Sequence, residues 1–423
     1  MMKARTWALL AAATLPVAAC HGVFDVESPG RIKEIDLNTK DAIPGIVTGM
    51  SYDVARALNN SSEALSLLSV ELWHGGSYNW GDVPRGIVQP EDINGTWEAM
   101  FRPRYTTVTG INRIKSLLTA DEFNKSFYVA RAYALAGFAN RHLGENVCKT
   151  ISPTTGAPES NTAEFDRGIE NFNNAITVGT AVKATGSKAA DTVLWAAYAG
   201  RATLKAWKGD WSGAANDAAL VPPTFAYTAP LMVDGLSNTL AYETHTRYEY
   251  TVWSTEFEMH PGDTRAPWHV QLNSQGKVAV GANGSTPMYQ QDKYASLGDN
   301  IPITKGTEML VLRAEAALRQ STPDIAGAYA LMNQERALSN MSPLTVATTI
   351  EQAWADLHFE RMAVTFLEGR HLWDERRWFA ESGPAHYDLP KSQGDPTASL
   401  ANRAQCIPIS QDEIRSNPNV PKP

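Results

Sequence analysis

The chain has 423 residues, of which 43% are hydrophobic and 19% charged, and its formal net charge is −8. This composition excludes intrinsic disorder and collagen-like sequence, and the lack of any basic block argues against a nucleic-acid partner. Twelve Trp and fourteen Tyr are available for a core or for stacking on sugars and peptides, and their abundance alone does not distinguish these uses.

The first twenty residues resemble the signal of a bacterial lipoprotein. Two basic residues precede an apolar run over residues 7–19, which is too short to span a bilayer but has the length of a signal-peptide core. The run ends in VAAC, which resembles a lipobox, so we expect a signal peptide over residues 1–19 and lipidation of Cys20. A plain secretory signal is the alternative. In proteobacterial lipoproteins an Asp directly after the lipidated Cys retains the protein at the inner membrane. This position is His21 here, which favours the outer membrane.

Cys148 and Cys406 remain as an even pair once Cys20 is assigned to lipid. In an oxidising compartment such a pair can form a disulfide, which would tie the middle of the chain to its end. Two buried free thiols are the alternative. The sequence contains no CxxC pair, so we expect no structural zinc site. We assign no metal ligands, and the sequence leaves open whether Ca²⁺ is bound.

Apolar residues recur at helical spacing through the first half of the chain. The predicted helices cover residues 39–72, 96–118, 127–143, 165–178 and 195–207. Those at residues 127–143 and 165–178 are expected to form a hairpin. The apolar positions of the second predicted helix are Trp97, Phe101, Val108, Ile111 and Ile114.

Small residues dominate residues 195–207, where Tyr198, Ala199, Ala202 and Ala206 share a helical stripe. A Gly-Asp-Trp turn at residues 209–211 and a second alanine-rich helix follow. This order resembles a tetratricopeptide unit, although no strict 34-residue period is present.

Pro, Gly, Asn and Ser interrupt the helical pattern over residues 222–302, and alternation over residues 248–253 predicts a short strand there. An irregular segment of this length inside a helical domain is more often a binding or docking surface than filler. Helices are predicted again at residues 307–320, 325–339 and 349–373, before a final loop and Pro-rich coil.

Several strings resemble, in order, those of the SusD/RagB family of nutrient-uptake lipoproteins. The family's "ER…EG-R…D-RRW" helix is matched at residues 360–378, and its terminal "PIP…E…NPN" segment at residues 407–419. Shorter matches lie at residues 24–29, 97–112, 130–133, 263–265, 293–294 and 312–315. One departure is LGENVC at residues 143–148, where the family commonly has GDVPL.

The patterns and the resemblance together predict an all-α fold of tetratricopeptide-like helical hairpins, with a long loop-rich insertion and minor β content. We expect four parts: a signal peptide, an N-terminal helical region, a loop-rich ligand or partner region, and a C-terminal helical region with its terminal loop. Their bounds are residues 1–19, 20–221, 222–306 and 307–423. Asp374 can pair with Arg370 or Arg377 on a continuing helix, so we interpret these charged motif residues as scaffold.

The resemblance implies a lipid-anchored protein at the cell surface that captures oligosaccharide or peptide and delivers it to a SusC-like TonB-dependent barrel. It implies neither catalysis nor a cofactor, and the sequence contains no HExxH, GxSxG, P-loop or EF-hand motif. Two alternatives stay open: a secreted glycan hydrolase on a helical scaffold, and a structural tetratricopeptide lipoprotein of envelope assembly.

Aromatic residues in polar loops are the binding candidates, because a ring can stack on a pyranose while polar neighbours bond its hydroxyls. The first cluster comprises Trp73, Tyr78, Asn79, Trp80 and Asp82. The second comprises Trp253, Trp268, His269 and Tyr289. In a helical array both clusters can face one surface. The alternative for each ring is a role in loop packing or in contact with the barrel.

Overall fold

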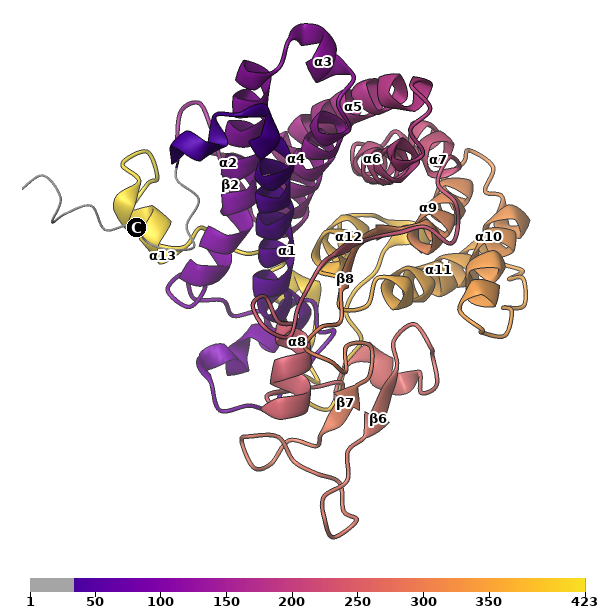
Figure 1. Ribbon diagram of the computed structural model, residues 1–423. Helices are drawn as coiled ribbons and strands as arrows, with labels where there is room; N and C mark the ends of the chain where they lie inside the picture. The colour runs from indigo at the N-terminus through magenta and orange to yellow at the C-terminus, as the bar shows by residue number, and fades with distance from the viewer. Residues whose placement is uncertain (1–33, 423) are drawn as a thin grey trace, which may run out of the picture.

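The computed structural model describes residues 34–422, so the predicted signal peptide and Cys20 lie outside the described residues. The fold is all-α with short strands, as the sequence predicts (Figure 1). Within residues 34–422, no helix is both long and apolar enough to cross a membrane.

The N-terminal helices form a curved array in which each long helix packs on the next (Figure 1). They are α1 (Ile43–Leu68), α2 (Asn94–Leu117), α3 (Ala120–Asn124), α4 (Phe127–Asn146), α5 (Ala163–Ala184), α6 (Ala189–Trp207) and α7 (Trp211–Ala218). The first helix starts four residues later than predicted, with Pro44 in its first turn, where a missing N–H costs nothing. Among the apolar positions of α2, Trp97, Ile111 and Ile114 are buried, whereas Val108 is 52% exposed.

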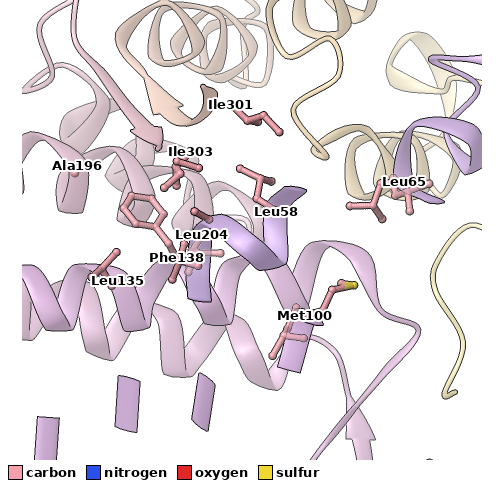
Figure 2. Close-up of a cluster of buried hydrophobic side chains, with 14 of the residues drawn as sticks. Leu58, Leu65, Met100, Leu135, Phe138, Ala196, Leu204, Ile301 and Ile303 are labelled. Atoms are coloured by element: carbon pink, nitrogen blue, oxygen red, sulfur yellow. The ribbon is translucent and has the colours of Figure 1, made fainter. Parts of the chain in front are cut away.

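Small residues let α4, α5 and α6 approach closely. Phe172 of α5 is fully buried, and a Cβ added at Gly137 of α4 or at Gly200 of α6 would meet its ring at 2.5 or 2.2 Å. The turn into α7 also follows local chemistry, since Gly209 has a φ of 84° and Asp210 caps the helix by accepting the Gly213 N–H at 2.8 Å. The core between these helices includes Leu58, Phe138 and the inserted Ile303 (Figure 2).

The loop-rich insertion contains short antiparallel strand pairs. The strands of the described chain are β1 (Trp73–His74), β2 (Lys149–Ile151), β3 (Pro158–Ser160), β4 (Ala226–Ala229), β5 (Tyr250–Thr251), β6 (Trp268–Val270), β7 (Tyr289–Gln291) and β8 (Ile301–Lys305). They pair as β1–β5, β2–β3, β4–β8 and β6–β7. The strand predicted over residues 248–253 is shorter than expected, and the one-turn helix α8 (Thr239–Ala241) precedes it.

The C-terminal helices are α9 (Gly306–Leu318), α10 (Ile325–Leu338), α11 (Ile350–Val364), α12 (His371–Phe379) and α13 (Gln411–Ser416). The prediction of one helix over residues 349–373 is wrong. Leu367 and Gly369 have positive φ values of 56° and 66°, which an α-helix cannot contain. Between them, the buried Glu368 carboxylate bonds the Lys293 Nζ at 2.7 Å and also contacts Lys305. These contacts stabilise the non-helical backbone between α11 and α12.

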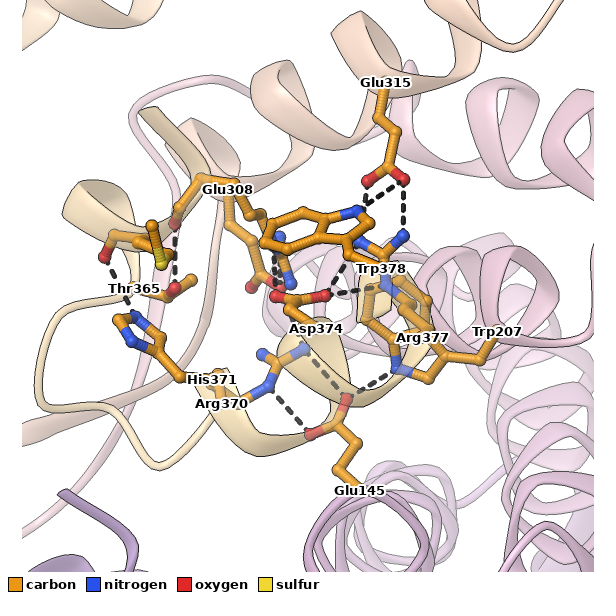
Figure 3. A network of polar contacts seen from close by, with 12 residues as sticks. Glu145, Trp207, Glu308, Glu315, Thr365, Arg370, His371, Asp374, Arg377 and Trp378 are labelled. Atoms are coloured by element: carbon orange, nitrogen blue, oxygen red, sulfur yellow. Dashed lines mark hydrogen bonds and ion pairs between the residues drawn. The ribbon is translucent and has the colours of Figure 1, made fainter. Parts of the chain in front are cut away.

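The break places a buried ionic network between α4, α9, α11 and α12 (Figure 3). Asp374 accepts hydrogen bonds from Arg361 and from Arg377, each at 2.9 Å. Arg370 does not pair with Asp374 as a continuing helix would allow; its guanidinium bonds Glu145 at 2.8 Å and Glu308 at 2.9 Å. All but Arg377 are at most 3% exposed, so these motif residues join helices rather than face a ligand.

A disulfide joins Cys148, just after α4, to Cys406 in the terminal segment, with 5.0 Å between the Cα atoms. Beside it Val147 and Ile407 form a parallel bridge, and the Cys148 N–H donates to the Ile407 carbonyl at 2.9 Å. The terminal segment is therefore fastened covalently and by backbone hydrogen bonds to the end of α4.

Candidate functional site

The two predicted aromatic clusters lie side by side because β1 pairs with β5. Trp73 lies opposite Thr251 and His74 opposite Tyr250 in this pair. The Thr251 hydroxyl also accepts the Tyr289 N–H at 2.8 Å, which links the pair to β7. Chain segments about 200 residues apart thus form one loop-rich region, at the end of the molecule where β6 and β7 are drawn (Figure 1).

The loop of the first cluster is held by Glu249. Its carboxylate accepts the Ser77 N–H at 2.7 Å and the Ser77 hydroxyl at 3.1 Å. A Cβ at Gly76 would lie 1.8 Å from Glu249 Oε2, so glycine is required for this approach. The loop carries Tyr78 to the surface, where it is 46% exposed with the Arg247 guanidinium 4.4 Å from its ring centre. One ring face of Tyr78 is therefore covered by a cation.

The other members of this cluster differ in exposure. Trp73 is only 4% exposed and packs inside the protein, and Trp80 is half-buried against the main core. Asp82 is exposed, with its carboxylate 3.8 Å from Arg85. Asn79 begins the 3₁₀ turn Asn79–Arg85 that contains both Trp80 and Asp82. Of Trp73, Tyr78, Trp80 and Asp82, the second and fourth reach the surface and Trp80 is partly accessible.

The second cluster is built on the β6–β7 ribbon. Trp268 and Tyr289 are half-buried and lie parallel, with ring centroids 5.2 Å apart and 5° between their planes. The Trp268 indole N–H donates to the Phe257 carbonyl at 3.0 Å, which fixes its orientation. In the register of the ribbon, Val270 lies opposite Tyr289 and Trp268 opposite Gln291, so both rings belong to one face of it.

His269 belongs to the opposite face of the ribbon, because successive side chains in a strand alternate. Its imidazole bonds Asp292 at 2.8 Å and Gln271 at 3.0 Å, and the hydrogen bond accepted by the Asp292 carboxylate raises the pKa of His269. Trp253, half-buried after β5, meets Trp73 edge to face at 6.4 Å. The structure thus separates His269 from the ring pair and joins Trp253 to the first cluster.

Two acids next to Tyr250 and Arg247 have raised pKa values. Burial raises the pKa of Glu63 in α1 to about 7, and the neighbouring charge of Glu243 acts in the same direction. The Tyr250 hydroxyl donates to the Glu63 carboxylate at 3.3 Å. Burial also raises the pKa of Glu243, whose carboxylate is 3.2 Å from Arg247. The charge of Arg247 is therefore shared between buried acids and the ring of Tyr78.

Sequence reasoning missed Arg247, Glu249 and Asp292, which position the aromatic residues. The available signal was their place within or beside the irregular segment, next to the alternating residues 248–253. Across the part of the chain that the structure describes, no three His, Cys, Asp or Glu side chains are grouped to hold a metal ion. The region offers ring faces and hydrogen-bonding groups, which suit a polar ligand with an apolar face.

Residues 236–422 match the model of the SusD family. This part of the chain is SusD-family sequence. The resemblance seen in the sequence motifs is thereby confirmed, and the match includes β6, β7 and all C-terminal helices. No curated protein matches this sequence.

Solved SusD-type structures share the fold over nearly the whole chain. A SusD-like carbohydrate-binding protein from Bacteroides vulgatus has a TM-score of 0.65 at 14% identity, covering 90% of this chain and 97% of its own. Surface glycan-binding protein A from Bacteroides thetaiotaomicron has a TM-score of 0.64 at 13% identity, covering 90% and 98%. A chitin-binding SusD homolog from Flavobacterium johnsoniae has a TM-score of 0.60 at 12% identity, covering 83% and 89%. At these identities the similarity establishes the SusD-like fold.

Proposed function

We propose that this protein binds an oligosaccharide at the cell surface and passes it to a SusC-like TonB-dependent barrel in the outer membrane, without catalysis and without a cofactor. The family match over residues 236–422 and the SusD-like fold support this role. Homologs of the same fold are described as glycan-binding and chitin-binding, which favours a glycan over a peptide. In this proposal Cys20 is the lipid anchor, and residues 222–306 form most of the ligand-binding region.

The observation that carries the proposal is the half-exposed ring pair of Trp268 and Tyr289 on a ribbon held rigidly by hydrogen bonds. The stacked pair can offer the outer face of one ring to the flat face of a sugar. Tyr78 and Trp253, on the neighbouring β1–β5 side, provide further aromatic surface. Asp82, exposed on the same loop as Tyr78, can bond sugar hydroxyls.

The direct test of binding is isothermal titration of the protein with a panel of soluble oligosaccharides, including chitin oligomers, and with peptide mixtures. Saturable heat with at least one oligosaccharide supports the proposal. Binding of peptides only would replace glycan with peptide as the ligand, and release of reducing ends would favour the glycan hydrolase. Absence of any ligand would favour the structural alternative.

Delivery to a barrel is tested by mild detergent extraction and pull-down of the native protein, followed by mass spectrometry. Recovery of a TonB-dependent barrel supports delivery, whereas its absence contradicts this part of the proposal. The anchor is tested separately with Cys20→Ser, which should release the protein from the outer membrane. A variant that still sediments with that membrane would contradict lipidation at Cys20.

A further inference from the structure

A small cavity between α1, α2, α4 and β8 has an unusual wall. Its volume is about 20 Å³, which is room for about one water-sized or halide-sized species. The residues around it are mostly apolar, and they include Leu58, Phe138 and Ile303. Its charged wall residues are two arginines, Arg141 of α4 and Arg370 at the start of α12, and no acidic side chain lines it within the described chain.

Both arginines have buried N–H groups left over. Arg141 is 4% exposed and donates one bond to the Ile303 carbonyl, while its Nε and Nη1 atoms have no partner among the described residues. Its nearest ion-pair contact is Glu145, at 3.9 Å, which is beyond hydrogen-bonding distance. Arg370 is 3% exposed and bonds Glu145 and Glu308, yet its Nη1 atom also lacks a partner in this part of the chain. Buried donors of this kind are costly when unpaired.

The third polar wall residue is neutral and already satisfied. Burial lowers the pKa of His142 to about 3, so its imidazole carries no charge at neutral pH. One ring nitrogen bonds the Ser61 hydroxyl at 3.0 Å, and the other bonds the Asn146 amide at 3.3 Å. The cavity wall therefore offers side-chain donors and positive charge but no free side-chain acceptor among the residues that line it.

We propose that this cavity is a binding site for a small monovalent anion of halide size, held by the guanidinium groups of Arg141 and Arg370. A water molecule also needs acceptors for its own two hydrogens; the side chains of this wall supply none, and the Ile303 carbonyl already accepts from Arg141. An anion only accepts, so it matches a wall of donors and apolar groups, and it offsets the charge of Arg141, whose nearest carboxylate is 3.9 Å away. The bound ion would join α4 to the start of α12.

Crystals of the protein grown in sodium bromide test the site directly. The expected result is an anomalous bromide peak in the cavity, in contact with both guanidinium groups. A density peak without anomalous signal, as for a water, or no peak at all would overturn the proposal. This measurement needs no variant and therefore does not depend on how well a variant folds.

Thermal unfolding gives the matched test in solution. The melting temperature is compared in sodium bromide and in sodium gluconate at the same ionic strength. Gluconate is the reference anion because it is too large for the cavity. A ligand that binds only the folded state raises the melting temperature. The rise should occur in the parent and vanish in Arg141→Met. Arg376→Met is the control. Like Arg141, Arg376 bonds a backbone carbonyl and lies 4.9 Å from the centre of an aromatic ring, but it does not line this cavity. Equal rises in all three proteins would contradict the proposal.

Discussion

The indole of Trp268 lies parallel to the phenol of Tyr289, with 5.2 Å between their centroids. Both side chains are half-buried: each ring packs against the other, and part of each remains accessible to solvent. We expect Trp268→Ala or Tyr289→Ala to weaken oligosaccharide binding about tenfold, which corresponds to about 1.4 kcal/mol of binding free energy. Isothermal titration with the oligosaccharide identified in the binding screen measures this loss.

Val270→Ala is the control for the ring pair, because Val270 lies on the same ribbon and is 38% exposed without a ring. Its affinity should equal that of the parent. Trp73→Ala is a second comparison: at 4% exposure, its loss should lower the unfolding free energy by about 3–5 kcal/mol. Unchanged affinity in both ring variants would remove Trp268 and Tyr289 from the binding site.

Gly200 of α6 leaves room for the ring of Phe172, which packs against the helix backbone at this position. A Cβ at this position would lie 2.2 Å from the ring, so we expect Gly200→Ala to destabilise the protein by about 1–3 kcal/mol in urea unfolding, despite the better helix propensity of alanine. Gly49→Ala in α1 is the matched control, since nothing lies within 4 Å of its Cβ position; it should stabilise by about 0.5–1 kcal/mol. Combining Gly200→Ala with Phe172→Leu should restore part of the loss.

The Cys148–Cys406 disulfide closes a loop with a sequence separation of 258. Removing it with Cys148→Ala and Cys406→Ala should lower the unfolding free energy by roughly 2–5 kcal/mol, because the unfolded chain gains conformational freedom. Dithiothreitol should lower the melting temperature of the parent and leave the double variant unchanged. If the reductant has no effect on the parent, the two cysteines are free thiols in the native protein.

Glu63 makes stability depend on pH. Its folded-state pKa of about 7 exceeds the ordinary carboxyl value of 4.5, so the folded protein holds this proton more tightly than the unfolded chain does. Stability should therefore fall as pH rises from about 4.5 to 7 and stay low above that, with an upper bound of about 3 kcal/mol from this group. Denaturant unfolding at either end of this window should show the fall.

Glu63→Gln keeps the size of the side chain and an acceptor for the Tyr250 hydroxyl while removing the titration. The difference in stability between pH 5 and pH 8 should shrink in this variant. Some dependence should remain, since burial also raises the pKa of Glu71 to about 8. A variant with the full pH dependence of the parent would show that Glu63 is ionised in the folded protein.

Local chemistry explains most of the elements that the sequence predicts correctly. Helical spacing of apolar residues identified most of the long helices, and Gly209 with Asp210 marked the start of α7, because these signals act within about four residues. Short sequence motifs, occurring in the same order as in the SusD family, identified the family of the C-terminal half. The sequence also indicated that aromatic residues in two polar loops are the binding candidates, since ring and neighbour types are local properties.

Only the tertiary structure decided which of those rings reach the surface and how distant residues meet. Trp73 is buried and Tyr78 exposed five residues later, because β5 and Glu249, far along the chain, fold against this loop. The helix break at Leu367 depends on Lys293 and Lys305, and the ion pair of Arg370 depends on Glu145. These contacts join residues far apart in the sequence, and burial makes their charges dominate over helix propensity.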